Sequence, residues 1–446
     1  MEIAISPHLL ASANDYVAAA AVFPMRANNY VIEELIDWSR APDDPIFRLV
    51  FPQPDMLQHD QLQVIKNAMD RDSSRIEMRD IVEGIRNLLN PHPANQKQEN
   101  VPHVNGQPVE GMQHKYRETC LFFPTEGQYC HSYCTYCFRW AQFTAVGSDQ
   151  QFQSKDVQQL VDYIKENRDL TDILFTGGDP MVMHAHQFSR YIDAILADPG
   201  TEHLGTIRIG SKSLSYWPYR YVTDPDSQEM LGVFEKIVKS GRHLSIMAHF
   251  SHPVELASPA VQEAMRRIRN TGANIRCQAP LIRGVNDQAS IWAEMWRKQT
   301  RLGAIPYYMF VERDTGAKHH FEVPLARAYE IYKEAVSSVA GTARTVQGPS
   351  MSASPGKIQV VGITTVPTAS GPEKVFVLRF LQARNPAWTK EVFFAKFDEN
   401  ASWLSDLKPA FGEKEFFYES QYRELVQRPG SSGQLFPLTG SMVARV

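Results

Sequence analysis

The sequence contains little cysteine and no long apolar run. Five of its 446 residues are cysteine, and three of these fall within eight positions. No apolar stretch approaches the roughly 20 residues that a membrane-spanning helix needs. The formal net charge is -4 without a long basic run, so we expect neither a membrane nor nucleic acid as a partner. The chain start lacks the basic residues and apolar core of a signal peptide. Clustered thiols without such a signal favour a reducing compartment, the cytoplasm.

The three clustered cysteines are Cys130, Cys134 and Cys137, spaced C-x3-C-x2-C. Thiolates at this spacing on one loop can converge on a metal centre, and cysteine-only ligation favours soft ions or an iron–sulfur cluster. A structural zinc site would need a fourth ligand at a matching spacing, usually from a second C-x2-C or H-x3-H pair. None follows, because Cys120 and Cys277 stand alone. The pattern therefore predicts a [4Fe–4S] cluster with one open iron. A fortuitous group of thiols or a partial zinc site is the alternative.

Strand-like and helix-like patterns alternate after this loop. The repeated alternation predicts an α/β fold with a parallel sheet, arranged as a partial (β/α)6 barrel whose active site lies at the carboxyl ends of its strands. The predicted strands cover 120–123, 172–176, 206–210, 244–250, 274–279 and 304–310, and the predicted helices cover 157–164, 188–196, 230–238, 261–268 and 291–299.

We expect three regions along the chain. They are a helical N-terminal region over 1–112, the barrel over 113–345, and a C-terminal α+β extension over 346–446. In the first region, helical patterns occur at 28–38 and 78–89, and the Pro-rich and Asn-rich stretch 91–110 reads as a long surface connection. The extension opens with a small-residue loop and a strand at 358–362, and its many aromatic side chains favour a packing role.

Small residues and an acid follow the second predicted strand. Gly177, Gly178 and Asp179 lie there, just before a helix. Glycines permit a close approach of the backbone, and the exposed amides and carbonyls of a strand end can bind the amino or carboxylate group of a ligand. A tight turn between a strand and a helix uses the same residues, so on their own they favour neither interpretation.

Four further residues are candidates for binding a cofactor. His249 ends a predicted strand, although a strand-end histidine is often only structural. Arg208 lies on another strand and could bind a carboxylate through two hydrogen bonds. Gln278, among apolar neighbours, needs a hydrogen-bonding partner that a cofactor would supply. Lys357 follows a loop of small residues that can present an amine for a Schiff base, although most lysines are only solvated.

Together these motifs resemble those of the lysine 2,3-aminomutase family, radical S-adenosylmethionine (SAM) enzymes that depend on pyridoxal phosphate (PLP). The resemblance runs from about Arg26 to Gly362, and the cysteine loop matches the family's cluster-binding loop. The other matching segments are His114-Lys115-Tyr116, Gly177-Gly178-Asp179, His249 to Pro253, Gln278 to Asp287, Pro306-Tyr307-Tyr308 and Lys357.

The resemblance implies roles for these residues. Arg139 would bind the α-carboxylate of the substrate, and Lys357 would carry PLP as a Schiff base. Tyr136, next to the third cysteine, would lie near the adenine of SAM, and the Gly-Gly-Asp segment would hold its methionine end. The expected cofactor contacts are Tyr136, Gly177, Gly178, Asp179, Arg208, His249, Gln278 and Lys357.

The resemblance also implies a reaction, that of an amino-acid 2,3-aminomutase, an isomerase. At the cluster an electron would cleave SAM to a 5′-deoxyadenosyl radical, which takes a β-hydrogen from an amino acid held on PLP as an aldimine, and the amino group moves from C2 to C3. The protein would position the reactants and exclude water and oxygen. An electron donor such as flavodoxin or ferredoxin and a homo-oligomeric state are further implications.

The chain departs from the family at the substrate end. Lysine-specific members use two aspartates to bind the side-chain ammonium of the substrate. At the first of these positions this chain has Glu312-Arg313-Asp314, where an alignment gap leaves open which residue matches the aspartate. Near the second position it has Ser350. An ammonium buried beside Ser350 and Arg313 would lack a partner. We therefore expect a substrate other than lysine, neutral or anionic. Glutamate is the nearest candidate, with Arg313 binding its distal carboxylate.

Two other departures concern cofactors, and they leave alternatives open. An arginine that binds the PLP phosphate in the family falls where this chain has Thr119, and no cysteine follows Cys277 to form the family's zinc site. A radical SAM enzyme that takes hydrogen from another small molecule or a peptide, without PLP-dependent amino migration, is therefore the second hypothesis. An iron–sulfur redox sensor or electron carrier is the third.

Overall fold

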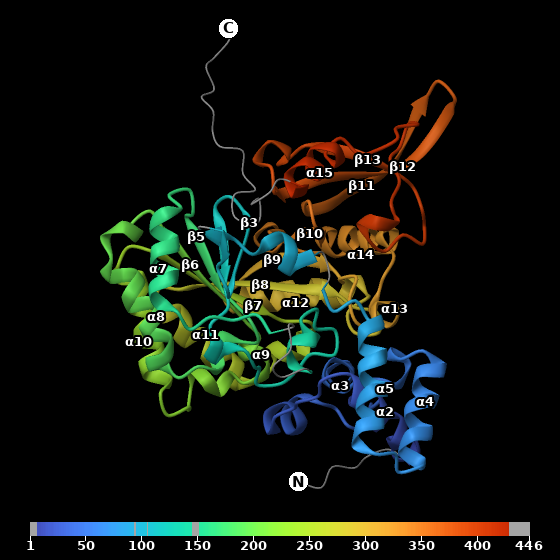
Figure 1. Ribbon diagram of the computed structural model, residues 1–446, viewed down its shortest axis with the longest axis horizontal. Helices are drawn as coiled ribbons and strands as arrows, with labels where there is room; N and C mark the ends of the chain where they lie inside the picture. Colours follow the sequence, from blue (N-terminus) through green and yellow to red (C-terminus); the bar gives the residue numbers. More distant parts are fainter. Residues whose placement is uncertain (1–6, 93–94, 105, 145–150, 428–446) are drawn as a thin grey trace.

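The computed structural model describes residues 7–92, 95–104, 106–144 and 151–427 (Figure 1). The first six residues, to which the prediction about a signal peptide applies, lie outside these ranges. No helix of the described residues is long and apolar enough to cross a membrane.

A parallel sheet forms the centre of the fold, which confirms the α/β class (Figure 1). Each predicted strand is present to within two residues at either end, and six consecutive strands pair in parallel in the order of the sequence. Their bounds are β4 Thr119–Phe122, β5 Asp172–Phe175, β6 Thr206–Ser211, β7 His243–His249, β8 Asn274–Leu281 and β9 Ile305–Val311.

The crossover helices between these strands are also where the periodicity predicts them. Side-chain caps set their starts: Asp156 accepts a hydrogen bond from the Gln159 amide at 2.8 Å, and Ser258 accepts one from the Val261 amide at 3.3 Å. Figure 1 shows α7, α8 and α10 together on one side of β5 and β6. The bounds are α7 Val157–Glu166, α8 Ala185–Ala197, α10 Ser227–Lys239, α11 Pro259–Asn270 and α12 Ala289–Arg301. One more helix, α14 Leu325–Ser337, follows β9 where none was predicted.

The two faces of this sheet differ in character. Successive side chains of a strand point to opposite faces, and on β6 Ile207 and Ile209 are fully buried while Arg208 between them is partly exposed. On β8, Cys277 is buried and its neighbour Gln278 is partly exposed. One face therefore packs in the hydrophobic core, and the other carries the candidate polar side chains.

The N-terminal region is mainly helical, as predicted, with two corrections. Its longer helices are α2 Ala13–Val22, α4 His59–Asp70 and α5 Arg75–Leu88. The predicted helix at 28–38 is only a short π-helical turn over Val31–Leu35, because the chain there turns to contact the cysteine loop. The predicted surface connection contains α6 Gln96–Asn100 and a small two-stranded ladder, while residues 93, 94 and 105 lie outside the described part.

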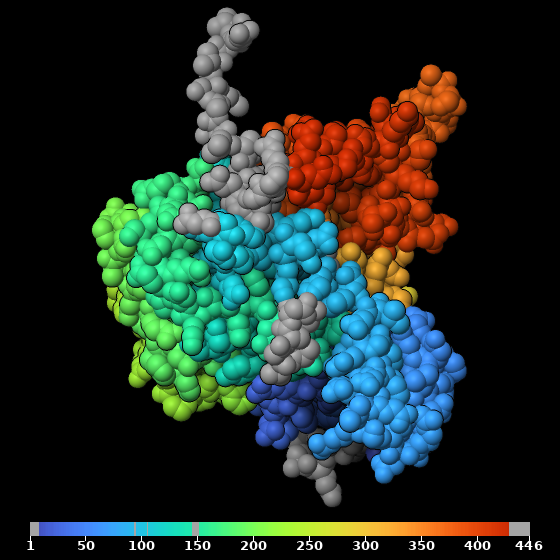
Figure 2. Space-filling model, viewed as in Figure 1, coloured from blue at the N-terminus to red at the C-terminus, as the bar shows by residue number. Residues whose placement is uncertain are grey.

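The sheet continues beyond the six strands on both sides. β3 Met112–Tyr116 pairs with β4 in antiparallel fashion, and β10 Gln347–Ser352 adds to β9 in parallel. Three antiparallel strands follow, β11 Gly356–Thr368, β12 Gly371–Ala383 and β13 Val392–Lys396, with α15 Glu419–Gln427 packed beside them. The far end of the β11–β12 hairpin projects from the surface at the upper right of Figure 2. The sheet is thus continuous across the predicted boundary at 345/346.

Candidate functional site

The N-terminal region anchors the cysteine loop, residues 130–137. The Tyr133 amide donates to the Arg26 carbonyl at 2.8 Å, and the Thr135 amide donates to the Leu49 carbonyl at 2.9 Å. Each bond joins the loop to a segment about 80 to 110 positions earlier in the chain. The loop is therefore fixed from a side that its own sequence does not reveal.

Asn28 connects this loop to a second segment of the site. Its side-chain nitrogen donates to the His131 carbonyl at 3.3 Å and to the Tyr216 carbonyl at 2.8 Å, and its backbone amide donates to the Ser132 hydroxyl at 3.1 Å. One side chain thus joins the cysteine loop to the short helix α9 Ser213–Tyr216, which follows β6. The loss of Asn28 would free both segments.

The three loop thiols lie close to one another. All are partly exposed and free of disulfides. Burial raises the pKa of Cys130 well above its usual value, with smaller contributions from Asp179, Cys137 and Cys134, and burial followed by Cys134 raises the pKa of Cys137 to about 12. Within the described ranges no three Cys, His, Asp or Glu side chains are arranged for a single metal ion. Each thiolate of a [4Fe–4S] cluster binds a different iron, so three separate thiols on one anchored loop fit a cluster.

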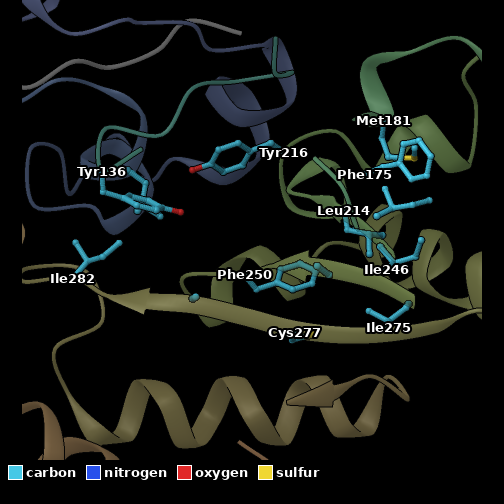
Figure 3. Packing of buried hydrophobic residues seen from close by; sticks show 14 of the residues in the cluster. Tyr136, Phe175, Met181, Leu214, Tyr216, Ile246, Phe250, Ile275, Cys277 and Ile282 are labelled. Atoms are coloured by element: carbon cyan, nitrogen blue, oxygen red, sulfur yellow. The ribbon is translucent and has the colours of Figure 1, made fainter. Parts of the chain in front are cut away.

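Tyr136 reaches from the loop to the end of β7. Its hydroxyl lies 3.0 Å from the Ser251 hydroxyl and 3.2 Å from Nε2 of His249. Burial, and then the charge of Lys212, lower the pKa of His249 well below its usual value, so its ring is neutral. Figure 3 shows the hydroxyl groups of Tyr136 and Tyr216 turned toward each other. The buried Tyr216 hydroxyl faces the Cys134 thiol, and among the described residues it has no hydrogen bond to a nitrogen or oxygen atom.

An ion pair that the sequence analysis missed lies beside these residues. Lys212 Nζ is 2.6 Å from Oε1 of Glu255, and the two side chains are 10% and 0% exposed. Lys212 also lies over the Tyr216 ring at 4.3 Å. Oε2 of Glu255 accepts from the Ser251 amide and, at 2.9 Å, from the His252 amide. In the sequence, Lys212 and Glu255 are single charged residues in two short loops, about 40 positions apart. Nothing in the sequence indicates that they pair.

The Gly-Gly-Asp segment has a clear structural reason for its residue types. A side chain on Gly178 would place its Cβ 2.5 Å from the Tyr129 amide nitrogen, just before the cysteine loop. Gly177 has φ +143° and faces the Gln128 side chain. The buried Asp179 accepts hydrogen bonds from the Ser211 hydroxyl and from the backbone amides of Met181 and Lys212. Burial still raises its pKa to about 6.

Arg208 and Gln278 lie on the polar face of the sheet. Arg208 Nε donates to Oδ1 of Asp172 at 2.7 Å, so part of its guanidinium is already engaged by the protein. Strand register aligns His249 with Gln278, and Gln278 with Tyr308. Two predicted cofactor contacts, His249 and Gln278, therefore lie in one row with Tyr308 across three neighbouring strands.

Two arginines share one aromatic ring next to the cluster loop. The guanidinium carbon of Arg139 lies 4.9 Å from the centre of the Phe138 ring, and that of Arg313 lies 4.5 Å from it. Arg139 Nη1 donates to the Thr176 hydroxyl at 2.8 Å and to the Gly177 carbonyl at 3.0 Å. Arg139 Nε and Arg313 Nη1 are buried without a hydrogen-bond partner among the residues described. Two such cations, each with a free donor, suit an anionic ligand.

Lys357 extends toward the same region from β11. Its Nζ lies 3.9 Å above the centre of the Tyr308 ring and 5.3 Å from that of Phe310, both on β9. Burial lowers the pKa of Lys357 to about 7, with further lowering by the charges of Arg208 and Arg313. A substantial fraction of this amine is neutral at physiological pH, which a nucleophilic lysine requires.

The neighbours of Arg313 answer the ambiguity about the charge at this position. Arg313 lowers the pKa values of Lys357 and Arg139, and so faces both. The neighbouring Glu312 is buried, and burial raises its pKa to about 8. Asp314 has a buried Oδ1 for which the described chain offers no partner. The charge directed at Lys357 is that of the arginine.

A second partly buried lysine, Lys115, lies near Lys357. Its Nζ donates to the Ala353 carbonyl, four positions before Lys357. Burial lowers its pKa well below the usual lysine value, and Arg384, Arg313 and Lys357 contribute. Thr119, which the sequence resemblance aligns with the family's phosphate-binding arginine, is buried on β4. A cationic group is thus present near Lys357 even though Thr119 carries no charge.

Comparisons with known proteins agree with this chemistry. A model of the 4Fe-4S single cluster domain matches residues 116–204, which include the cysteine loop. The chain is 27% identical to a putative L-lysine 2,3-aminomutase of Aquifex aeolicus over 384 residues, 86% of this chain and 87% of that protein. It is 27% identical to the L-lysine 2,3-aminomutase of Methanococcus maripaludis, over 53% of this chain and 51% of that protein. It is 28% identical to the glutamate 2,3-aminomutase of Clostridioides difficile, over 45% of this chain and 44% of that protein. The last two matches span about half of each relative.

Solved structures are less similar. A radical SAM methyltransferase from Sphaerobacter thermophilus is 14% identical, with 56% of this chain and 72% of that chain covered and a TM-score of 0.34. A radical SAM methyltransferase from Kitasatospora setae is 12% identical, with coverages of 44% and 36% and a TM-score of 0.30. Similarity at this level carries no argument about the activity of the chain.

Proposed function

We propose that this chain is a member of the lysine 2,3-aminomutase family of radical SAM enzymes, and that it moves an amino group from C2 to C3 of an amino acid other than lysine. The proposal requires three groups in one site: a [4Fe–4S] cluster on Cys130, Cys134 and Cys137, SAM, and PLP on Lys357. When bound, the cluster and SAM supply a 5′-deoxyadenosyl radical, and PLP supplies an aldehyde for the amine and a ring that stabilises the migrating nitrogen.

The observation that carries the proposal is the position of Lys357. Its amine lies against Tyr308 and is lowered in pKa to about 7, and one of the charges that lowers it is Arg313. Arg313 in turn packs on Phe138, the residue after the third loop cysteine. A partly neutral, buried amine within two side chains of a cluster loop is what a PLP-dependent radical reaction needs, and an electron carrier has no use for it.

The chain's own residues have distinct tasks in this scheme. Lys357 provides the amine that holds PLP between substrate molecules. Arg139, with its free Nε, binds the α-carboxylate of the amino acid. The rings of Tyr308, Phe310 and Phe138 shield the site from water, which protects reactive species and strengthens charge pairing inside. The neutral His249 can accept or donate one hydrogen bond to a cofactor without adding charge.

The substrate follows from the charge at the far end of the site. Arg313 faces Lys357 and Arg139 with a free, buried Nη1, whereas Ser350 is buried and uncharged. A lysine side chain would bring a second cation against Arg313. A distal carboxylate would pair with it, so we infer glutamate, or an amino acid of similar shape and charge, as the substrate.

Several finer features belong to the same proposal. We infer that β4 to β9 form the partial barrel of radical SAM enzymes, with the N-terminal region over 1–112 and the extension over 346–446 as its neighbours. We also infer an electron donor such as flavodoxin or ferredoxin, a homo-oligomer, and a reducing compartment such as the cytoplasm. Tyr136, Asp179, Arg208 and Gln278 stay candidates for cofactor contacts.

The test is to incubate the reconstituted protein anaerobically with SAM, PLP, a reductant and each of the twenty amino acids. A β-isomer of glutamate, formed together with 5′-deoxyadenosine, is the expected product. Borohydride should fix PLP on Lys357, as peptide mass spectrometry would report. A reconstituted protein that never takes up PLP would rule out amino migration.

A second candidate function rests on Thr119. If the uncharged residue at this position leaves the PLP phosphate too weakly bound, the enzyme would instead take hydrogen from another small molecule or a peptide. This reaction would form 5′-deoxyadenosine at a rate that does not depend on added PLP. The PLP titration in the same assay separates the two functions.

A further inference from the structure

Arg384 forms a buried network that joins three distant parts of the chain. It follows β12, and its side chain is fully buried. Its Nη2 lies 2.9 Å from Oε2 of Glu99 and 2.5 Å from Oδ1 of Asn100, and its Nη1 donates to the Glu99 carbonyl at 3.0 Å. Tyr422 of α15 also donates to Oε2 of Glu99, at 2.6 Å. A rigid, planar guanidinium with this many partners fixes the geometry of what it contacts.

The remaining donors of Arg384 hold the loop that precedes Lys357. Its Nε donates to the Ser354 carbonyl at 2.7 Å, and its backbone amide donates to the Pro355 carbonyl at 3.0 Å. These carbonyls lie three and two positions before Lys357. Lys115 donates to the carbonyl one position earlier, that of Ala353. Three successive carbonyls of the loop are therefore held by cationic residues or their backbone.

The backbone next to Lys357 leaves little freedom of its own. Gly356 approaches β12 so closely that a Cβ there would lie 2.4 Å from the Gln382 carbonyl. Lys357 pairs with Gln382 and Ile358 pairs with Phe380, so Leu381 is one extra residue in β12 at this point. A bulge of this kind changes the direction of the side chains beside it. The direction of Lys357 thus depends on the register of β12, the strand that leads into Arg384.

We propose that Arg384 is a positioning residue for Lys357: by holding the loop 353–356 against Glu99 and Asn100, it directs the lysine amine toward Tyr308. The inference rests on the proposed function only in one respect, that PLP is the molecule with which the amine of Lys357 reacts. It assigns the C-terminal extension a part in the site, because β12 and α15 supply the residues that fix the loop. The extension is then a component of the active site and not an appendage.

The test compares two variants. Arg384→Lys keeps the positive charge but loses the planar guanidinium with its several donors. Glu99→Gln keeps the size of the side chain and one of its two acceptor oxygens, and removes the negative charge. Arg423→Ala is the matched control, because Arg423 lies in the same extension in an exposed pair with Glu415. Each protein is mixed with PLP, and the amine of Lys357 adds to the aldehyde carbon with loss of one water. Borohydride added at successive times reduces the imine formed so far. Peptide mass spectrometry then measures the labelled fraction of Lys357, which gives the rate. Thermal unfolding of each protein is measured alongside.

A second measurement needs no PLP. Competitive acylation with acetic anhydride over a range of pH gives the midpoint at which Lys357 becomes reactive. The charged groups that face this amine are Arg208, Arg313 and Lys115, and none of them is changed in the variants. A displaced loop should admit water to the amine, so the midpoint should move toward the ordinary lysine value.

We expect Arg384→Lys to slow the reaction of Lys357 with PLP on the order of 10- to 100-fold, as displacements of about 1 Å do in other sites, and to raise the acylation midpoint. Arg423→Ala should match the wild type in both. A variant that melts earlier yet keeps the wild-type PLP rate and acylation midpoint overturns the proposal, because its role is then only structural. If Arg384→Lys does not fold, Glu99→Gln decides by the same two readouts. A wild-type chain that never reacts with PLP defeats the proposed function, while the acylation midpoints still test Arg384.

Discussion

Arg313 provides the sharpest test of the proposed substrate. We consider Arg313→Gln, which removes the charge that faces Lys357 and packs on Phe138. Removing one partner of a buried, hydrogen-bonded charge pair costs about 2–5 kcal/mol. Arg313 is only partly buried, so the lower part of this range applies. A loss of about 2–3 kcal/mol corresponds to a fall of roughly 30- to 150-fold in kcat/KM for glutamate.

The assay measures formation of the β-isomer from glutamate and from lysine, each with the other amino acid as competitor. Arg327→Gln is a suitable control, because Arg327 lies on α14 in an exposed ion pair with Glu330. Arg313→Asp should lower kcat/KM for glutamate more than Arg313→Gln does, and should let lysine compete. The reason is that the charge at the end of the site that receives the substrate side chain is then negative. Efficient turnover of lysine by the wild type, or unchanged glutamate kinetics in Arg313→Gln, would refute the reasoning about charge and leave the family assignment standing.

Three other predictions concern the cluster and Lys357. Alanine at any cysteine of the loop 130–137 should abolish the iron and sulfide content of the reconstituted protein. Alanine at Cys120 or Cys277, both buried on strands, should leave this content unchanged. Iron analysis of the variants checks both expectations. Asn28→Ala removes bonds to two segments of the site and should cost about 1–3 kcal/mol and speed cluster loss to a chelator, followed by absorbance. Folding lowers the pKa of Lys357 from 10.5 to about 7, so its charge destabilises the fold fully below pH 7 and less as the pH rises toward 10.5. Lys357→Met should therefore stabilise the cofactor-free protein by about 5 kcal/mol at pH 6 and by about 2 kcal/mol at pH 9. Urea unfolding measures both values, and equal gains at the two pH values would contradict the lowered pKa.

Elements whose signal is local could be predicted from the sequence. The six parallel strands and their helices were visible because buried strands and amphipathic helices each carry a period of their own. The three cysteines were visible because their spacing alone specifies a shared centre. The π-helical turn at Val31–Leu35 was not. Asn28, whose side chain accepts from the Val31 amide at the start of the turn, is held by a loop about 100 positions away.

The glycines at 177 and 178 illustrate a different case, in which the structure supplies a second reason for the residue type. Close approach to a ligand was the expected reason, but the close approach in the structure is to Gln128 and Tyr129, which lead into the cysteine loop. Either reason requires glycine, so the sequence could not separate them. Both reasons nevertheless place the end of β5 beside the cluster, and a ligand at the cluster would still meet this turn.

What the sequence could not provide is the set of partners that gives Lys357 its properties. A lysine after a small-residue loop is ordinarily a solvated side chain, and no local pattern indicates otherwise. Its burial comes from Tyr308, about 50 positions earlier, and the loop before it is held by Arg384, 27 positions later, and by Glu99, more than 250 positions earlier. Charged partners of this kind are matched through space, and the residues between them can vary in number without changing the pair. The chemistry of a reactive amine therefore depends on tertiary contacts that only a structure reveals, whereas the cluster, whose ligands lie on one loop, is specified almost entirely by the sequence.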